Sequence, residues 1–264
     1  MKEFKSFYKT VSTSEGDRCK YPTRLDSYGC GCQHDCSYCY AKSLLDFRGL
    51  WNPNEPSVAS LKKIERKLEK VSPGSTLRLG GMTDCFQPIE RNERVTREVI
   101  KMLNERNIKY LIVTKSDLVV EYEDILRPDL AHIQISVTST VPVNFEKAVP
   151  PDRRIRAVLQ LQDDFDTRIR LSPLLHEFID FDHINGVGIK KAVVEFLRVN
   201  TWVKRWLNID YSEYTLKSGG YWHLPLERKI ELLDKVKIPN VVICEDVPEH
   251  YQKWNGDEKC DCCR

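Results

Sequence analysis

The sequence predicts an α/β fold built on a parallel sheet, either open or closed into a full or partial barrel. Short apolar runs alternate with amphipathic stretches along most of the chain, which is the pattern of repeated strand–helix units. The length of 264 residues, 41% of them hydrophobic, suits a barrel of this kind with one sizeable core. About six or seven strand–helix units fit in this length.

Six apolar runs are predicted to be strands, because they are short and rich in Val, Ile, Leu and aromatic residues. In chain order they are Thr76–Gly80, Tyr110–Thr114, His132–Val137, Thr167–Leu171, Ala192–Leu197 and Val241–Cys244. A further strand is expected to lead into Gly29, Cys30 and Gly31.

Four stretches between these runs have apolar residues three and four positions apart, which indicates one buried face of a helix. Their marker residues are Leu61, Ile64, Leu68 and Val71, then Val95, Val99, Met102 and Leu103, then Ile155, Val158, Leu159 and Gln162, and finally Leu226, Ile230 and Leu233. Polar residues follow several of the predicted strands, and chemistry gathers at the carboxyl ends of strands in barrels.

Charge and hydropathy argue against several classes of protein. The 41 basic and 39 acidic residues leave a net charge of +2, which gives little support to nucleic-acid binding driven by net charge but leaves room for a local basic groove. No apolar run approaches the roughly 20 residues of a membrane span, and the first five residues lack the apolar core of a signal peptide. We therefore expect a cytoplasmic protein without a membrane partner.

Cysteine is the unusual component. There are ten cysteines, and eight of them crowd into two short stretches, one over residues 30–39 and one over residues 244–263. In a reducing cytosol such clusters point to metal or redox chemistry rather than to disulfides.

The first stretch contains Cys32, Cys36 and Cys39, with C-x3-C-x2-C spacing. Three thiolates this close together can converge on one metal centre, and soft thiolates select zinc, copper(I) or iron–sulfur clusters. A structural zinc site takes four ligands, for which Cys30 and His34 are the nearest candidates. Three cysteines on a [4Fe–4S] cluster would instead leave one iron open to a small molecule.

With an aromatic residue before its last cysteine, this motif resembles that of the radical S-adenosylmethionine (SAM) superfamily. The branch that contains spore photoproduct lyase is the most similar, because its members carry Thr-Asp-x-x-Gln-Pro and Thr-Lys-Ser segments after the second and third strands. Here Thr83, Asp84, Gln87 and Pro88 match the first segment, and residues 114–116 match the second. The last sixty residues or so resemble an uncharacterised bacterial and phage subgroup with a cysteine-rich tail.

The resemblance implies a fold and a domain organisation. The expected fold is a partial (β/α)6-type TIM barrel over residues 25–200, with an N-terminal extension over 1–24 and a capping region with the cysteine-rich tail over 201–264. It also implies an enzyme in which a [4Fe–4S] cluster cleaves SAM reductively, and the resulting 5′-deoxyadenosyl radical takes a hydrogen atom from the substrate.

Site residues carry over position by position. The resemblance makes Cys32, Cys36 and Cys39 the cluster ligands, and Lys115 the partner of the SAM carboxylate. The other residues that it assigns to SAM are Tyr38 at the adenine, Gly80 and Gly81 at the amino group, Thr83 and Asp84 as polar partners, and Ser136 at the ribose or carboxylate. Arg170 and Glu195, charged residues within apolar strands, are expected to contact SAM or substrate, or else to form a structural ion pair.

One departure from the branch concerns radical quenching. In spore photoproduct lyase a cysteine just after the second strand returns a hydrogen atom to the product radical, whereas here Met82 stands near that register and Cys85 lies three residues on. Cys85 is either a catalytic thiol or a buried small hydrophobe. Tyr40, which follows the last cluster cysteine, is a candidate radical relay.

The tail leaves three interpretations open. Cys244 with Cys260, Cys262 and Cys263 is a candidate ligand set for a second iron–sulfur cluster. Alternatively, a tail thiol such as Cys262 or Cys263 acts as a hydrogen-atom donor, or the tail is a frayed end.

The leading hypothesis is a radical SAM enzyme of lyase or isomerase type that acts on a nucleobase or nucleotide, with flavodoxin or ferredoxin as electron donor. An aromatic group near basic residues is either a base-stacking platform or a cap on the barrel; it comprises Tyr211, Tyr214, Tyr221 and Trp222, with Lys204, Arg205 and Lys217. Alternatives are radical SAM rearrangement or maturation of a peptide or small metabolite, and a non-catalytic thiolate protein that binds zinc or transfers electrons.

Overall fold

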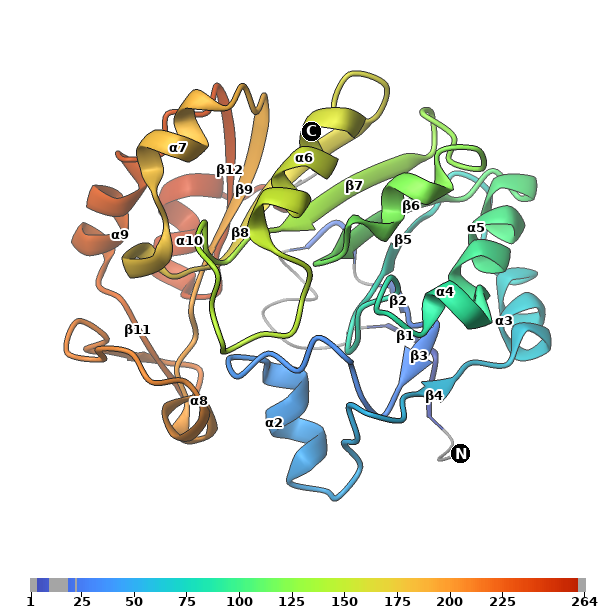
Figure 1. Ribbon diagram of the computed structural model, residues 1–264, viewed down its shortest axis with the longest axis horizontal. Coiled ribbons are helices and arrows are strands. Elements are labelled where there is room, and N and C mark those ends of the chain that lie inside the picture. Colours follow the sequence, from blue (N-terminus) through green and yellow to red (C-terminus); the bar gives the residue numbers. More distant parts are fainter. Residues whose placement is uncertain (1–3, 10–18, 22, 261–264) are drawn as a thin grey trace.

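The computed structural model describes residues 4–9, 19–21 and 23–260, and this part of the chain contains one large sheet and two small ones (Figure 1). The strand order in the large sheet is β1-β2-β5-β6-β7-β8-β9-β12. Strand β1 is antiparallel to β2, and every other neighbouring pair is parallel. The predicted parallel α/β sheet is therefore confirmed.

The six predicted strand runs coincide with strands of this sheet to within a few residues. The large sheet consists of β1 (Phe7–Lys9), β2 (Thr23–Leu25), β5 (Thr76–Leu79), β6 (Lys109–Thr114), β7 (Ala131–Ser136), β8 (Asp166–Leu174), β9 (Lys191–Phe196) and β12 (Asn240–Cys244). The small sheets pair β3 (Tyr28–Gly29) with β4 (Ser57–Val58), and β10 (Leu216–Ser218) with β11 (Tyr221–His223).

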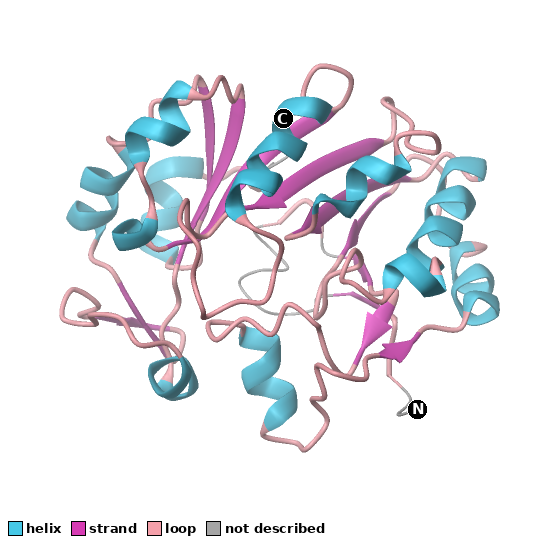
Figure 2. Cartoon of the chain, viewed as in Figure 1, coloured by secondary structure: helices cyan, strands magenta, loops and turns pink. Residues whose placement is uncertain are grey.

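Helices cover the outer face of the sheet, and the inner face opens toward loops and α2 (Figure 2). The helices are α2 (Tyr40–Asp46), α3 (Leu61–Leu68), α4 (Glu90–Glu93), α5 (Val95–Glu105), α6 (Pro151–Leu161), α7 (Phe181–Gly186), α8 (Thr201–Trp206), α9 (Leu226–Leu233) and α10 (Pro248–Asn255), with 3-10 turns η1 (Asp117–Tyr122) and η2 (His176–Phe178). The strands form an arch from β2 to β12, which is a partial barrel. No helix in the described ranges combines the length and apolarity of a bilayer span.

The sheet extends beyond the boundaries expected for the barrel. Strand β12 pairs in parallel with β9 over five residues, so the region after residue 200 supplies a strand of the large sheet. Its apolar run, Val241 to Ile243, gives hydrogen-bonding partners to the backbone of β9 and becomes the edge strand of the sheet.

Amphipathic spacing explains how the helices pack. On α5 the buried residues Val95, Val99, Ile100 and Leu103 recur at helical intervals, and each fully buried aliphatic side chain of this kind stabilises the fold by roughly 1.5–3 kcal/mol. A buried carboxylate, Glu90, then joins four elements: it accepts hydrogen bonds from Tyr28 of β3, from Tyr122 of η1 at 2.5 Å, and from the Thr96 amide of α5 at 2.9 Å.

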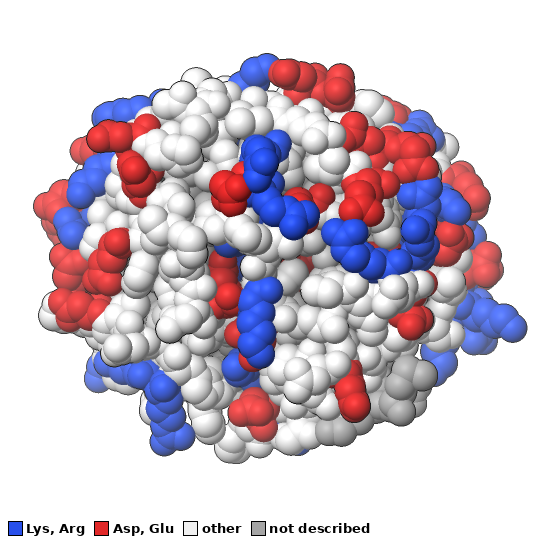
Figure 3. Space-filling model, in the orientation of Figure 1, with Lys and Arg blue, Asp and Glu red and all other residues white. Residues whose placement is uncertain are grey.

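The exposed charges are of mixed sign. On the face shown in Figure 3, basic and acidic residues are interspersed, without a large area of either sign. This arrangement agrees with the net charge of +2, and the face shown in Figure 3 has no extended basic surface.

Gly80, directly after β5, shapes the edge of the sheet where the polar strand ends gather. Its φ of 85° lies in the left-handed region, and a Cβ there would stand 3.0 Å from the Val113 carbonyl oxygen and 3.3 Å from the Thr83 carbonyl oxygen. Gly188 has a similar φ of 88°, but nothing lies within 4 Å of its Cβ position.

Substitutions at Gly80 and Gly188 therefore separate two effects, backbone strain at a positive φ and steric contact of the added Cβ with its neighbours. Gly188→Ala should lower the free energy of unfolding by about 1 kcal/mol, through backbone strain alone. Gly80→Ala should lower it by about 2–3 kcal/mol, because its Cβ would also be too close to the Val113 carbonyl oxygen of β6. Urea unfolding of the two variants measures both values. Equal losses would contradict the contact assigned to Gly80.

Candidate functional site

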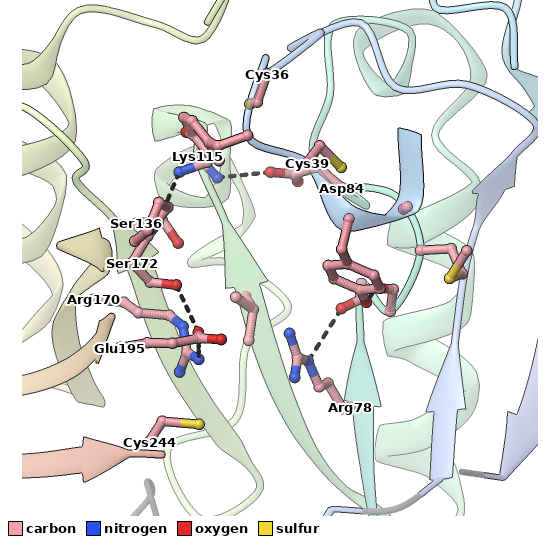
Figure 4. A pocket seen from close by; sticks show the side chains of 18 of the residues that line it. Cys36, Cys39, Arg78, Asp84, Lys115, Ser136, Arg170, Ser172, Glu195 and Cys244 are labelled. Atoms are coloured by element: carbon pink, nitrogen blue, oxygen red, sulfur yellow. Dashed lines mark hydrogen bonds and ion pairs between the residues drawn. The ribbon is translucent and has the colours of Figure 1, made fainter. Parts of the chain in front are cut away.

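A cavity of about 250 Å³ lies inside the arch and reaches the carboxyl ends of the strands (Figure 4). All seven parallel strands contribute to its wall, through Arg24, Arg78, Thr114, Ser136, Arg170, Glu195 and Cys244 among others. Its position matches the place where the sequence predicted the chemistry.

The cysteine loop between β3 and α2 forms one side of this cavity. Cys32, Cys36 and Cys39 all line it, and at 9% and 8% exposure the first two are largely removed from bulk water. Burial raises the pKa of all three thiols, that of Cys36 to about 12. A metal that binds here must therefore displace protons from the thiols.

This donor set fits an iron–sulfur cluster. Three thiols are soft ligands, and they come from one short loop at a cavity. Within the described residues, no three His, Cys, Asp or Glu side chains converge on a single ion. A cubane cluster does not need such convergence, because each thiolate binds a different iron.

The loop is fastened to the segment that follows β5. The His34 ring lies 3.1 Å from the Asp84 carboxylate, the Gln33 amide donates to Gln87 at 2.8 Å, and the Gln33 side chain accepts from the Ile89 amide at 2.6 Å. The Thr-Asp-x-x-Gln-Pro motif thus acts through Asp84 and Gln87 as an anchor for the cysteine loop.

Asp84 also joins this loop to the end of β6. It accepts hydrogen bonds from the Thr114 hydroxyl at 2.8 Å and from the Lys115 amide at 2.6 Å. Burial by itself would raise the pKa of Asp84, but His34 and the backbone amides of Lys115 and Phe86 hold that pKa below its usual value. The geometry makes Asp84 a positioning residue for its neighbours in the cavity wall.

A second buried carboxylate holds the turn after β5 in place through hydrogen bonds. Asp26, which directly follows β2, accepts from the Gly81 amide at 2.7 Å and from the Met82 amide at 3.0 Å. The Thr83 hydroxyl donates to the Tyr28 carbonyl at 2.6 Å, so it also supports the turn. Gly80, Gly81 and Thr83 all line the cavity, as expected.

Lys115 lies at the centre of a charged group that the sequence revealed only in part. Its ammonium donates to the Thr138 hydroxyl at 2.9 Å and to the Ser172 carbonyl at 3.2 Å, and it lies 3.7 Å from the Glu146 carboxylate. It also stands 5.2 Å from the centre of the Tyr38 ring. The expected basic residue therefore does face the cavity (Figure 4).

Glu146 is held by buried partners. Its side chain is 1% exposed, and it accepts from Arg154 at 2.5 Å and from the Tyr38 hydroxyl. Burial would raise the pKa of Glu146, but Lys115 and Arg154 lower it to about 2. The Tyr38 hydroxyl is thus engaged by Glu146 and Thr138, while its ring remains on the cavity wall.

Arg170 and Glu195 pair with each other on the same side of the cavity as Lys115, because Ser172 contacts both Lys115 and Glu195 (Figure 4). Gln134 accepts from Arg170 at 2.7 Å, and Ser172 donates to Glu195 at 2.7 Å, so both charges are fixed by neighbouring strands. Although burial would raise the pKa of Glu195, Arg170 and Arg198 lower it to about 2. The two residues form an ion pair, and both line the cavity.

Tyr40, at the start of α2, reaches into the cavity and donates to the Gly81 carbonyl. Arg24 donates to its hydroxyl at 3.3 Å, and the guanidinium of Arg198 lies 5.5 Å from the ring centre. Ser136 also lines the cavity, at the end of β7.

The remaining sequence candidates divide into three groups. Cys85 is 1% exposed, beneath the turn after β5, and is absent from the cavity wall. Cys244 and Cys260 do line the cavity, and so does Cys19, which was not a candidate. Cys262 and Cys263 lie outside the described residues.

Sequence reasoning missed Glu146, Asp26 and Cys19. Asp26 could have been identified as a site residue from its position directly after a strand. The sequence analysis did not predict where β2 ends, so this position was not recognised. Glu146 stands in a long connection without periodicity, so its partners become apparent only in three dimensions.

The comparisons with known proteins bear on the fold. No family model matches the sequence. An uncharacterised protein of Methanocaldococcus jannaschii is 26% identical over 205 residues, which cover 69% of this chain and 74% of that protein.

Solved structures of spore photoproduct lyase share the architecture. A cysteine-to-serine variant superposes with a TM-score of 0.66 at 16% identity, covering 97% of this chain and 79% of that one. The chain has the radical SAM partial-barrel fold. A complex of spore photoproduct lyase with a dinucleoside spore photoproduct superposes with a TM-score of 0.64 at 14% identity, covering 96% of this chain and 77% of that one. A variant with bound AdoMet and the same dinucleoside superposes with a TM-score of 0.62 at 16% identity, covering 94% of this chain and 79% of that one.

The lowered pKa of Glu146 makes a prediction for acid stability. Its folded-state pKa of about 2 lies below the ordinary value of 4.5, so its contribution to stability is present above pH 4.5 and is lost as the pH falls toward 2. We expect Glu146→Gln to be less stable than wild type at neutral pH, with the difference shrinking between pH 4.5 and 2. Urea midpoints across this range measure the effect; a difference independent of pH would contradict the assignment.

Proposed function

We propose that this protein is a radical SAM enzyme whose [4Fe–4S] cluster is held by Cys32, Cys36 and Cys39. The observation that carries the proposal is that these three thiols, on a C-x3-C-x2-C loop, line a cavity inside a partial barrel together with Lys115 and other charged side chains. The likeness to spore photoproduct lyase supports it. When bound, the cluster supplies an electron to SAM and so yields a 5′-deoxyadenosyl radical.

The chain's own residues would bind and orient SAM. An ammonium has three donors, and Lys115 directs two of them to Thr138 and to the Ser172 carbonyl. Its Glu146 contact of 3.7 Å is longer than a hydrogen bond, so the third donor is available to a ligand carboxylate. Gly80 keeps the adjacent strand end free of side-chain atoms, which leaves room for the amino group.

Several charged side chains on the cavity wall are already paired with a charge of opposite sign. Arg170 neutralises Glu195, and Asp246 neutralises Arg198 with a separation of 3.0 Å. Because these groups are already paired, they orient a ligand through directed dipoles and hydrogen bonds rather than through unbalanced charge.

We further propose a nucleobase or nucleotide as the substrate. Three of the matched lyase structures hold a dinucleoside spore photoproduct. In this chain the Arg198 guanidinium lies between two aromatic rings, 5.5 Å from the centre of Tyr40 in the cavity and 5.8 Å from that of Tyr221 on β11. Lys204 lies 4.3 Å from the centre of the Trp222 ring on the same hairpin. Aromatic faces with cations beside them favour stacking of bases.

This chemistry requires a one-electron donor, for which we propose a protein such as flavodoxin or ferredoxin. We also propose a cytoplasmic location, where thiols stay reduced. Both statements are part of the proposal.

SAM cleavage tests the first step. Anaerobically reconstituted and reduced wild-type protein should release 5′-deoxyadenosine, and Cys39→Ala should release none because the cluster loses a ligand. Lys115→Met should weaken SAM binding about 10–100-fold, the loss expected for a hydrogen bond to a charged group. Lys101→Met is the matched control, since Lys101 lies on the exposed face of α5 and pairs only with Glu98 among the described residues. Absence of iron and of cleavage in the wild type would refute the proposal.

Isotope transfer tests the substrate. Incubation with SAM and a deuterated thymine-derived dinucleoside lesion should place deuterium in 5′-deoxyadenosine. Arg198→Ala should reduce this transfer more than it reduces cleavage of SAM alone, because Arg198 contacts the aromatic rings rather than Lys115. Cleavage without any deuterium transfer would exclude this lesion as substrate and leave the SAM chemistry intact.

A further inference from the structure

Arg78 brings to the cavity wall a positive charge that no described carboxylate neutralises. It lies on β5 between Leu77 and Leu79, which are buried in the hydrophobic core. Because side chains alternate along a strand, Arg78 projects from the opposite face of the sheet, into the cavity (Figure 4). Its Nε donates to the Gly80 carbonyl at 3.1 Å, and within the described ranges no acidic side chain forms an ion pair with it.

The carboxylates of the described cavity wall are engaged elsewhere. Asp84, Glu195 and Asp246 are held by the partners described above. Glu245, the remaining one, accepts from the Lys229 ammonium at 2.9 and 2.7 Å, and Lys229 is fully buried. The charge of Arg78 is therefore left for water or for a ligand to balance.

A second guanidinium lies beside the first. Arg24 of β2 and Arg78 are register partners in neighbouring parallel strands, which are about 4.8 Å apart, and both line the cavity. Arg24 donates to the Tyr40 hydroxyl at 3.3 Å, and that hydroxyl donates to the Gly81 carbonyl, next to the Gly80 carbonyl that Arg78 contacts. An anion between the two strands would offset the repulsion of like charges that face each other across them.

The donors of Arg78 fit a phosphate group. A guanidinium has five N–H donors, and Nε uses one of them on Gly80. Within the described residues neither Nη1 nor Nη2 donates to a protein group, so a planar fork faces the cavity, and such a fork matches two oxygens of a phosphate or carboxylate. A phosphate group carries more charge and more acceptor oxygens than a carboxylate, so it is the better partner for two adjacent guanidinium groups.

We propose that Arg78, with Arg24 beside it, forms a phosphate subsite in the cavity. It binds a phosphate group of the substrate, either terminal in a nucleotide or bridging in a dinucleotide. The statement that this phosphate belongs to the substrate rests on the proposed function, whereas phosphate binding at Arg78 is independent of it. The subsite is separate from Lys115, which directly follows β6 and was assigned above to the SAM carboxylate.

Anaerobic titration calorimetry on the full-length chain tests the subsite. The probes are inorganic phosphate, thymidine monophosphate with a terminal phosphate, a thymidine dinucleotide with a bridging phosphate, and thymidine, which has none. Wild type should bind one of the two nucleotides about 10–100-fold more tightly than thymidine, the gain expected for hydrogen bonds to a charged group. The nucleotide that binds more tightly identifies the phosphate as terminal or bridging.

Variants at Arg78 assign this preference to the subsite. Arg78→Met should bind the preferred nucleotide and inorganic phosphate about 10–100-fold more weakly, with unchanged affinity for thymidine. Arg78→Lys keeps the charge without the fork and should lie between wild type and Arg78→Met. Arg156→Met is the matched control, since Arg156 is exposed on α6 and pairs with Asp152. Circular dichroism establishes that each variant is folded, and Arg78→Lys carries the comparison if Arg78→Met is not.

Different results identify different failures. Equal affinities of wild type and the Arg78 variants for every phosphate probe would overturn the subsite. Weaker SAM binding by Arg78→Met, with phosphate affinities unchanged, would assign the guanidinium to the SAM carboxylate and overturn the subsite as well. A wild type that cleaves SAM without any preference for phosphate loses the subsite and keeps the proposed function. A phosphate preference that depends on Arg78, in a protein that neither binds iron nor cleaves SAM, overturns the proposed function and leaves the subsite standing.

Discussion

The cavity depends on a buried carboxylate, Asp84, that fastens the cysteine loop to the sheet. It faces His34 of the loop on one side and accepts from Thr114 and the Lys115 amide, at the end of β6, on the other. A buried charge in such a position costs free energy unless every partner is present, and loss of one partner from a buried pair costs about 3–5 kcal/mol. The relative position of the cysteines and Lys115 is therefore set by Asp84.

A second carboxylate, Glu146, performs the same task from the other side of the loop. The Ser37 amide donates to the Phe145 carbonyl at 2.8 Å, and the Lys147 amide donates to the His34 carbonyl at 2.6 Å, so the segment around Glu146 lies alongside the cysteines. Glu146 joins Lys115, Tyr38 and Arg154 within this contact. The loop is thus clamped between two segments, which suits a site that must present three thiols without rearrangement.

Local pattern explains why much of the fold was predictable and part of the site was not. Strand β6 and helix α5 could be predicted because their apolar residues recur at short intervals in the sequence. The motif of the three cysteines could be recognised for the same reason, since its spacing involves only nearby residues. The ion pair of Arg170 with Glu195 and the contact of Lys115 with Glu146 join residues 25 and more than 30 positions apart, so the sequence indicated charged groups but not their partners. For the same reason the sequence did not indicate that Cys19 lines the cavity, since Cys244 and Cys260 beside it come from the opposite end of the chain.

The bridge between Cys19 and Cys260 also bears on the order of folding. It joins residues separated by nearly the whole described chain, so its closure carries the largest loss of chain entropy and comes after the local strand–helix units have formed. During synthesis the strands from β2 to β9 can assemble before Cys260 has left the ribosome. The part of the cavity wall that contains Cys19 and Cys260 is then among the last parts of the fold to close.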